Sequence, residues 1–370
     1  MALEQTPIEL EKLSAQIQKV VGSGAPAAAK MMAAKGLVPM GPQELVTVIY
    51  QLSHDPDAKV AQAAVATANH LPERILTGAL GDALDPRVID FFSTRLVQYP
   101  PLVEKVLLNP ITADETFVTL GRRLPERELE ILAGNQTRLL RHPAIIEAIY
   151  FNRNARMSMV DRLLELAVRH GLVLEGIPQF KQIAASILQS GATGEADARA
   201  IADAQAAADA AFSAVLAAAP EEEELEAVEA GQEPADMARV TNSRMLSIAA
   251  RVRLASLGNA SHRTVLIKDT NRAVAMAAVS SPAVSENEAV RWAGQRELSE
   301  DVIRYIADRK EWHKNYAFKL GLVNNPKCPL RVSIGLILHL RANDLRSLSR
   351  SKNVPAQLAK AAKQRMLTRT

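Results

Sequence analysis

Cysteine and aromatic side chains are scarce in this chain of 370 residues. The single cysteine, Cys328, has no partner for an intramolecular disulfide and argues against a thiolate metal site. Aromatic residues make up 4% of the sequence, whereas hydrophobic residues make up 48%. The apolar content is therefore aliphatic and rich in alanine, which favours closely packed helices over β-sandwiches.

Long apolar runs are also absent. No stretch of 18 or more apolar residues occurs, so we expect no membrane span. The segment MALEQTPIELEK places acidic residues near its start and lacks an apolar core, which is not the pattern of a signal peptide. A reducing cytoplasm is the expected compartment.

The sequence contains none of the common catalytic motifs. GxxxxGK[ST], GxGxxG, HExxH and GxSxG are all missing, and the seven histidines show no metal-ligand spacing. Cys328 lies in Pro-Lys-Cys-Pro, where we interpret it as a small residue that fills a turn. We therefore expect no catalytic residues, no metal ion and no cofactor, and predict that the protein is not an enzyme.

Charge divides the chain into three blocks. Residues 1–190 hold 19 Lys and Arg against 20 Asp and Glu, a net charge of −1. Residues 191–236 hold 12 acidic residues and only Arg199, a net of −11, and residues 237–370 hold 24 basic and 9 acidic residues, a net of +15. We predict an N-terminal helical domain at 1–190, an alanine-rich and then acidic linker at 191–236, and a basic helical domain at 237–370.

Short turn signals recur through the first block. Asp55-Pro56 and Asp85-Pro86 lie thirty residues apart, and His142-Pro143 follows later. Each pair predicts a turn whose polar residue caps a helix while proline takes the first helical position. Apolar residues then recur every three or four positions, so that each helix has one stripe to bury against its neighbours. This pattern predicts stacked helical repeats.

The third block continues this punctuation. Ser281-Pro282 and Asn325-Pro326 lie 44 residues apart, which is consistent with two units of about twenty-two residues. We therefore predict two helical-repeat arrays of the α-solenoid kind, joined by the acidic linker.

Three stretches carry a family resemblance: AKGLVPMGPQELVTVIYQLSHDPDAKV, NQTRLLRHPAIIEAIYFNRNARMSMVDRLLELA and LVNNPKCPLRVSIGLILHLRANDLRSLSRSKNVPAQLAKAA. Their turn-plus-helix pattern resembles HEAT repeats and variant leucine-rich repeats, and is similar to uncharacterised bacterial helical-repeat proteins. The resemblance implies an all-α repeat fold and no particular chemistry.

The strongest functional signal is the basic third block, where cations alternate with aromatic residues as in surfaces that bind phosphates and bases. Arg304, Lys310 and Lys314 are spaced as if on one helix face. The residues that we predict to meet an anionic partner are Arg304, Arg309, Lys310, Trp312, Lys314, Tyr316, Lys319, Arg346, Arg350 and Lys352.

The class of partner stays open at this point. Repeat proteins also spread cations over solvated faces, and the aromatic residues could belong to the core. We expect a scaffold or adaptor that binds protein partners, with nucleic-acid binding through the basic block as the alternative. A further hypothesis is that the acidic linker covers the basic face and competes with an anionic partner.

Overall fold

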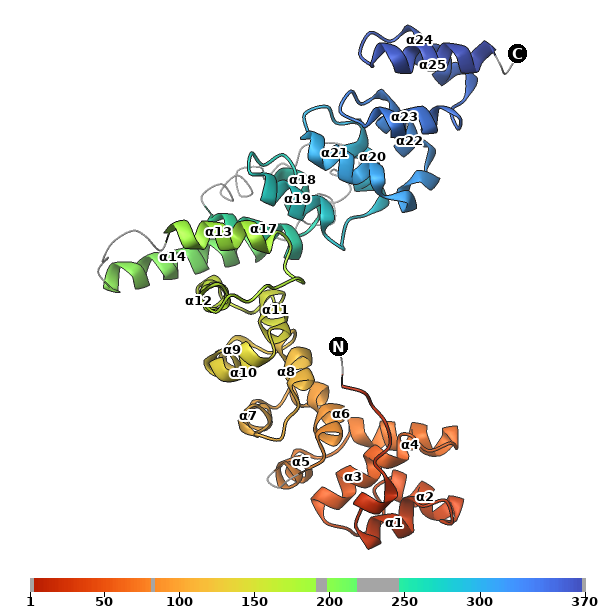
Figure 1. The fold of residues 1–370 in the computed structure, drawn as a ribbon. Helices are drawn as coiled ribbons and strands as arrows, with labels where there is room; N and C mark the ends of the chain where they lie inside the picture. Colours follow the sequence, from red (N-terminus) through yellow and green to blue (C-terminus); the bar gives the residue numbers. More distant parts are fainter. Residues whose placement is uncertain (1–2, 81–83, 191–197, 218–245, 368–370) are drawn as a thin grey trace. The chain divides into compact units, whose positions relative to one another are not determined.

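The computed structural model describes residues 3–80, 84–190, 198–217 and 246–367. Helices make up all of the regular structure in these ranges, and no strand occurs within them, so the predicted all-α class is confirmed (Figure 1). The chain divides into two compact units, residues 1–174 and residues 175–370. None of the helices in the described ranges is long and apolar enough to cross a membrane.

The first unit holds twelve described α-helices, preceded by one 3₁₀ turn. They are η1 (Leu10–Lys12), α1 (Ala15–Val21), α2 (Ala27–Ala34), α3 (Pro42–Leu52), α4 (Ala58–Asn69), α5 (Glu73–Ala79), α6 (Pro86–Leu96), α7 (Pro100–Leu108), α8 (Asp114–Gly121), α9 (Glu126–Gly134), α10 (Gln136–Arg141), α11 (Ala144–Tyr150) and α12 (Met157–Arg169).

The second unit also consists of short helices joined by turns. Its described elements are α13 (Phe180–Ser190), α14 (Ala198–Ala217), α17 (Ile248–Leu257), α18 (Ala260–Leu266), α19 (Arg272–Ser280), α20 (Glu286–Gly294), α21 (Glu300–Asp308), the 3₁₀ helix η3 (Lys310–Lys314), α22 (Tyr316–Asn324), α23 (Leu330–Ile337), α24 (Ala342–Arg350) and α25 (Ala356–Leu367).

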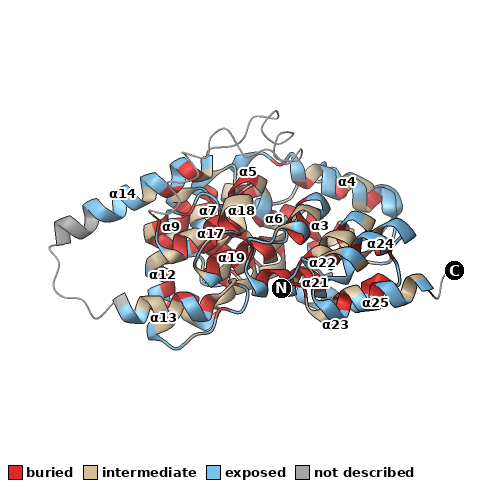
Figure 2. Ribbon diagram, turned by 90° about the horizontal axis from the view of Figure 1, so that it is seen from above, coloured by how far each residue is buried: buried red, intermediate tan, exposed pale blue. Residues whose placement is uncertain are grey.

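Within each unit, packing is between helices that are close in the sequence. In the first unit, α3 packs on α4, α5 and α6, and α8 packs on α6, α9 and α11. In the second unit, α20 packs on α21 and α22, and α24 packs on α25. α4 buries one stripe, formed by Val60, Ala64 and Ala68, which are four residues apart, while its other faces are largely exposed (Figure 2). Central helices such as α3 and α11 are instead buried on most sides.

Small residues let neighbouring helices approach closely. A Cβ atom on Gly121 of α8 would lie 3.3 Å from the Cβ atom of Ala148 on α11. A Cβ atom on Gly321 of α22 would lie 3.2 Å from that of Ala293 on α20. The alanine-rich, aromatic-poor composition therefore serves close contact between helices.

Of the predicted turn signals, Asp85-Pro86 starts a helix as expected, whereas the helices after His142-Pro143, Ser281-Pro282 and Asn325-Pro326 begin at Ala144, Glu286 and Leu330, beyond the prolines. The Asp85 carboxylate accepts a 2.9 Å hydrogen bond from the Arg87 amide, and Pro86 is the first residue of α6, as predicted. At the earlier pair, α4 begins at Ala58 and is capped by Asp57, so the predicted start at Pro56 is wrong. Asp55 instead accepts hydrogen bonds from the Asp57 amide and from the Lys30 ammonium.

A buried asparagine occupies an equivalent turn in each unit. Asn152, which is 2% exposed, donates 2.9 Å hydrogen bonds to the carbonyl oxygens of Gly121 and Leu124. Asn325, also 2% exposed, donates 3.0 Å bonds to Ala293 and Gln295. In both turns the asparagine Oδ1 accepts the amide two residues later. The side chain thus ties one turn to a helix end about thirty residues earlier, where carbonyls lack helical partners.

The second unit begins before the charge boundary. Residues 175–190, counted with the N-terminal array from charge alone, belong to this unit, and α13 packs on α17. Part of the expected linker forms α14, which also packs on α17. Its Phe212 and Val215 are buried, the Arg253 guanidinium lies 4.9 Å from the Phe212 ring, and His262 Nε2 is 2.8 Å from the Val215 carbonyl oxygen. The acidic stretch 218–236 lies outside the described residues, as does its predicted covering of the basic face.

Candidate binding surfaces

The ten predicted anion-binding residues all lie in the second unit, on elements from α21 to the turn after α24. The exposed ones are Arg304, Arg309, Lys310, Lys314, Arg346, Arg350 and Lys352, and the partly buried ones are Trp312, Tyr316 and Lys319. α21 ends at Asp308, and Lys310–Lys314 forms a 3₁₀ helix. Arg304, Lys310 and Lys314 therefore do not share the face of one helix, and that part of the prediction is wrong.

The aromatic residues of this region are engaged within the fold. The Trp312 ring packs edge-on against Phe318, with centroids 6.0 Å apart. The Tyr316 hydroxyl donates to Asp344 and accepts a 3.0 Å bond from the Arg341 amide, and the Arg341 guanidinium lies over its ring. These contacts engage each ring within the unit, and both residues remain partly exposed.

The predicted cations differ in how far they are neutralised. Arg304 pairs with Glu300 at 2.6 Å, and Arg309 pairs with Glu311 at 3.4 Å. Lys310, Lys314 and Lys319 form no ion pair with the described residues, nor do the cations of α24 and the turn that follows it. The positive character of this surface therefore comes mainly from the lysines and arginines that no described carboxylate pairs with.

Some of these cations line one hollow on the second unit. It has a volume of about 660 Å³ and is lined by Arg304 and Asp308 of α21, Lys310 and His313 of η3, and Arg331 of α23, with Ala307, Pro329 and Val332. Arg331 is exposed and was not among the predicted residues. It comes from the next turn-plus-helix unit, so only packing of successive units brings it beside Lys310.

Cys328 does not take part in this surface. It is buried beside Ser333 at the start of the unit that carries Arg331. Burial raises the pKa of the thiol, which keeps the sulfur protonated and poorly nucleophilic at neutral pH.

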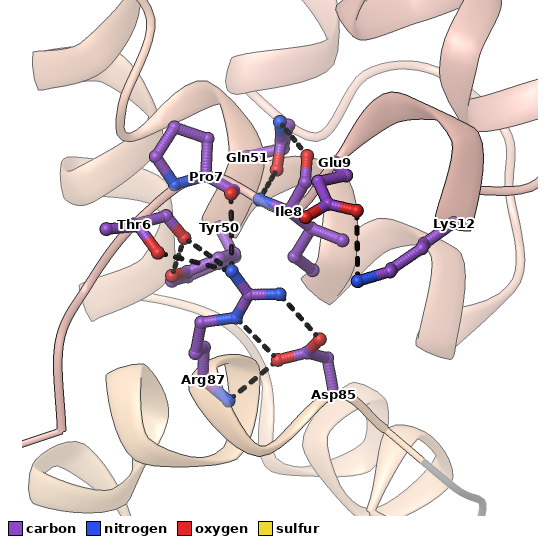
Figure 3. A network of polar contacts seen from close by, with 9 residues as sticks. All are labelled: Thr6, Pro7, Ile8, Glu9, Lys12, Tyr50, Gln51, Asp85 and Arg87. Carbon is purple, nitrogen blue, oxygen red and sulfur yellow. Dashed lines mark hydrogen bonds and ion pairs between the residues drawn. The ribbon is translucent and has the colours of Figure 1, made fainter.

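The first unit contains a second candidate surface, formed by α3 and α6, which binds a segment near the start of the same chain. Residues 3–9, here called the strap, form no helix and run across α3 and α6 (Figure 3). Ile8 is the one buried side chain of the strap, at 3% exposure, whereas Thr6, Pro7 and Glu9 are exposed. Most of the strap is therefore held by polar contacts to its main chain.

Two residues of α3 bind that main chain. The Tyr50 hydroxyl donates a 2.7 Å hydrogen bond to the carbonyl oxygen of Thr6. Gln51 contacts both polar groups of Ile8: its Oε1 accepts from the Ile8 amide at 2.9 Å, and its Nε2 donates to the Ile8 carbonyl at 3.0 Å (Figure 3). Burial raises the pKa of Tyr50 to about 12, so its hydroxyl stays a donor throughout the neutral range.

Arg87 of α6 completes the grip on the main chain. Its Nε and Nη2 atoms each lie 3.0 Å from the Asp85 carboxylate, while Nη1 lies 3.4 Å from the Thr6 carbonyl oxygen and 3.3 Å from that of Pro7. Burial raises the pKa of Asp85, but the hydrogen bonds from Arg87 outweigh it and leave that pKa below its ordinary value. The ionised Asp85 thus orients the guanidinium toward the strap.

Asp90 of α6 holds the other end of the strap. Its carboxylate accepts a 2.6 Å hydrogen bond from Gln5 Nε2 and a 2.8 Å bond from the Thr116 hydroxyl of α8. Burial raises the pKa of Asp90, and the two hydrogen bonds offset this only in part. The folded state therefore favours the neutral carboxyl, so stability is lost as the pH rises through this raised pKa.

We expect Asp90→Asn to raise the melting temperature at pH 7 by roughly 1–3 °C. The neutral amide removes the cost of the buried charge, and the Gln5 amide, whose Oε1 accepts no bond within the described residues, can turn to accept from it. The gain should disappear as the pH falls through the raised pKa of Asp90, because the wild-type carboxyl then becomes neutral as well. Circular dichroism melts from pH 3.5 to 7.5 measure this, and a variant that melts lower than wild type at pH 7 contradicts it.

Sequence patterns did not indicate the strap surface. Tyr50 and Gln51 lie in an ordinary helical stripe, and the strap contacts of Arg87 join residues about eighty positions apart. The one available signal was the Asp85-Pro86 cap, which marks the start of α6 but not what its first turn binds.

No family model, no curated protein and no solved structure matches the chain at a significant level.

Proposed function

We propose that the chain is a non-enzymatic scaffold or adaptor of the cytoplasm, an α-solenoid of HEAT-like character whose repeat surfaces bind protein partners. The observation that carries this proposal is the strap. Side chains of two successive helical layers, α3 and α6, bind the main chain of an irregular segment through Tyr50, Gln51 and Arg87. A surface with this chemistry binds polypeptide.

The packing pattern supports the same proposal. Helices that pack mainly on their sequence neighbours form a stack, and each layer of a stack leaves one edge free to bind. Such stacks present long surfaces on which successive layers contact one ligand.

A capture experiment tests this function. The full chain, tagged and immobilised, is expected to retain specific proteins from a cell extract after nuclease treatment, with less than a twofold change between 50 and 300 mM salt. Retention of no protein after nuclease treatment, together with salt-sensitive retention of nucleic acid from an untreated extract, would refute the protein-scaffold proposal.

The hollow on the second unit favours one alternative, nucleic-acid binding. Arg304, Lys310 and Arg331 converge there from three elements. If six to eight cations of the basic surface met phosphates, the logarithm of the affinity for duplex DNA would fall with that of salt at a slope of about −5 to −7. Fluorescence anisotropy with a labelled duplex measures this slope.

Charge reversal assigns such binding to the hollow. Lys310→Glu combined with Arg331→Glu should lower the affinity for DNA at least tenfold and flatten the slope by about 2. The matched control, Lys59→Glu with Arg74→Glu on the first unit, should change neither, because these exposed cations lie outside the hollow. If the two double variants lost the same amount of affinity for DNA, the binding would be a non-specific attraction to net positive charge and not a property of the hollow.

A further inference from the structure

We propose that the strap occupies an exchangeable peptide-binding groove, and that an extended segment of a partner protein takes its place. The groove is formed by Tyr50 and Gln51 of α3, Arg87 and Asp90 of α6, and Thr116 of α8. This inference rests on the proposed function. The ligand is a short extended peptide, and the strap competes with it for the groove.

The contacts recognise features that every peptide has. Four of the hydrogen bonds between the groove and the strap end on carbonyl oxygens of Thr6, Pro7 and Ile8, and one more comes from the Ile8 amide. The paired bonds of Gln51 to the N–H and C=O of one residue reproduce those that a neighbouring β-strand would make. A partner segment can make the same bonds whatever most of its side chains are.

Three side chains of the strap also meet the groove: Gln5 Nε2 donates to Asp90, Thr6 Oγ1 accepts from Arg87, and Ile8 supplies the apolar anchor. Ile8 is buried, and beside it the structure leaves a hollow of about 310 Å³ lined by Leu13, Ile17, Thr47 and Leu84, among others. The strap therefore does not fill the space that its anchor enters. The ligand that fits is an extended segment with a large apolar residue at this position and a small polar residue two places before it, as Thr6 precedes Ile8.

The floor of the groove does not depend on the strap. α3 packs directly on α6, and α6 packs directly on α8. Arg87 is oriented by Asp85 on the same helix turn, and Asp90 by Thr116. These side chains are therefore in place when the strap is absent, and such preorganisation lowers the entropy cost of binding a replacement.

The strap competes with any partner as a tethered ligand. The strap is joined to the groove through η1, α1 and α2 of the same unit, and a ligand tethered within one chain has an effective concentration of roughly millimolar order. A partner peptide must therefore bind better than the strap or be presented at high local concentration. Only peptides with an affinity high enough to displace the strap are therefore expected to bind.

A labelled peptide of residues 3–12, LEQTPIELEK, tests the groove in two forms of the otherwise complete chain. One form lacks residues 3–9, and the other carries Ile8→Asp, which removes the apolar anchor and keeps the chain length. Fluorescence anisotropy should show 1:1 binding to both forms, at least tenfold tighter than to the wild-type chain. Circular dichroism confirms that each form is helical.

Point variants locate the binding. Gln51→Ala and Arg87→Ala, each placed in the deleted form, should weaken the peptide at least fivefold, whereas Arg74→Ala, an exposed residue of α5, should not. The same peptide with Ile8→Asp should not bind, and one with Ile8→Phe should bind at least as tightly as the original, because the hollow has room for the ring.

Absence of binding to both helical forms overturns the groove, while proteins captured by the wild-type chain would still support the scaffold function. Dimerisation of the wild-type chain in light scattering, lost on deletion of residues 3–9, would assign the groove to a second copy and also overturn the proposal. Failure of the capture experiment alongside tight peptide binding would reject the scaffold and keep the groove.

Discussion

Replacement of Glu288 by alanine is expected to lower the free energy of unfolding by about 3–5 kcal/mol. The Glu288 and Arg263 side chains are 2% and 5% exposed, and the guanidinium meets the carboxylate through Nε and Nη2 at 2.9 and 3.0 Å. Removing the carboxylate leaves the Arg263 charge buried between α18 and α20 without its counter-ion. It also breaks the capping box in which Glu288 accepts from the Ser285 amide.

Chemical denaturation of the full chain measures the loss, which should also lower the melting temperature of the second unit by about 10 °C. The matched control is Glu286→Ala in the same first turn, where the side chain is exposed and the cost should stay below about 0.5 kcal/mol. Arg263→Met combined with Glu288→Leu should recover much of the stability, because no unpaired charge remains. A small loss in Glu288→Ala would show that water reaches Arg263.

Replacement of the turn asparagines by leucine should destabilise each unit separately. Asn152→Leu and Asn325→Leu each remove a side chain that satisfies two buried carbonyl groups and one amide. An unsatisfied buried polar group costs about 1–3 kcal/mol, so we expect a loss of roughly 2–4 kcal/mol for each variant. The two turns lose bonds of the same kinds, although the Leu124 carbonyl keeps a 3.1 Å bond from Asn154 Nδ2.

Hydrogen exchange read by mass spectrometry tests where each loss acts. Asn152→Leu should speed exchange in α8, α9 and α11, and Asn325→Leu in α20 and α22, because these helices meet at the affected turns. Asn353→Leu, at an exposed turn position, is the control and should change neither region. Faster exchange spread evenly over the chain would contradict a local role for these side chains.

The helical class and the start of α6 could be predicted from the sequence because local chemistry determines them. Asp85 caps α6 within two residues, and the four-residue spacing of Val60, Ala64 and Ala68 specifies a buried stripe whatever lies against it. The error at Asp55-Pro56 has a physical cause as well. Two acidic residues compete there, and Asp57 caps the helix because Lys30 holds Asp55.

The binding surfaces could be predicted only in part. Exposed cations such as Lys310 and Lys314 were identified, since charge is visible in the sequence. Tyr316 was assigned to the surface, although its hydroxyl and ring are engaged by Asp344 and Arg341, a contact between separate helices that no spacing predicts. The contacts of Tyr50, Gln51 and Arg87 with the strap could not be predicted for the same reason, because they join residues that are far apart in the sequence.

The strap has a consequence for the order in which the first unit assembles. Most of its helix packing joins near neighbours, and such short-range contacts form fast. The bond from Gln5 to Asp90, by contrast, joins residues 85 positions apart. During synthesis the strap leaves the ribosome well before α6, so it waits as a free segment until the groove exists. The contacts of the strap with Arg87 and Asp90 therefore form late, after α3 has packed on its neighbours in the sequence.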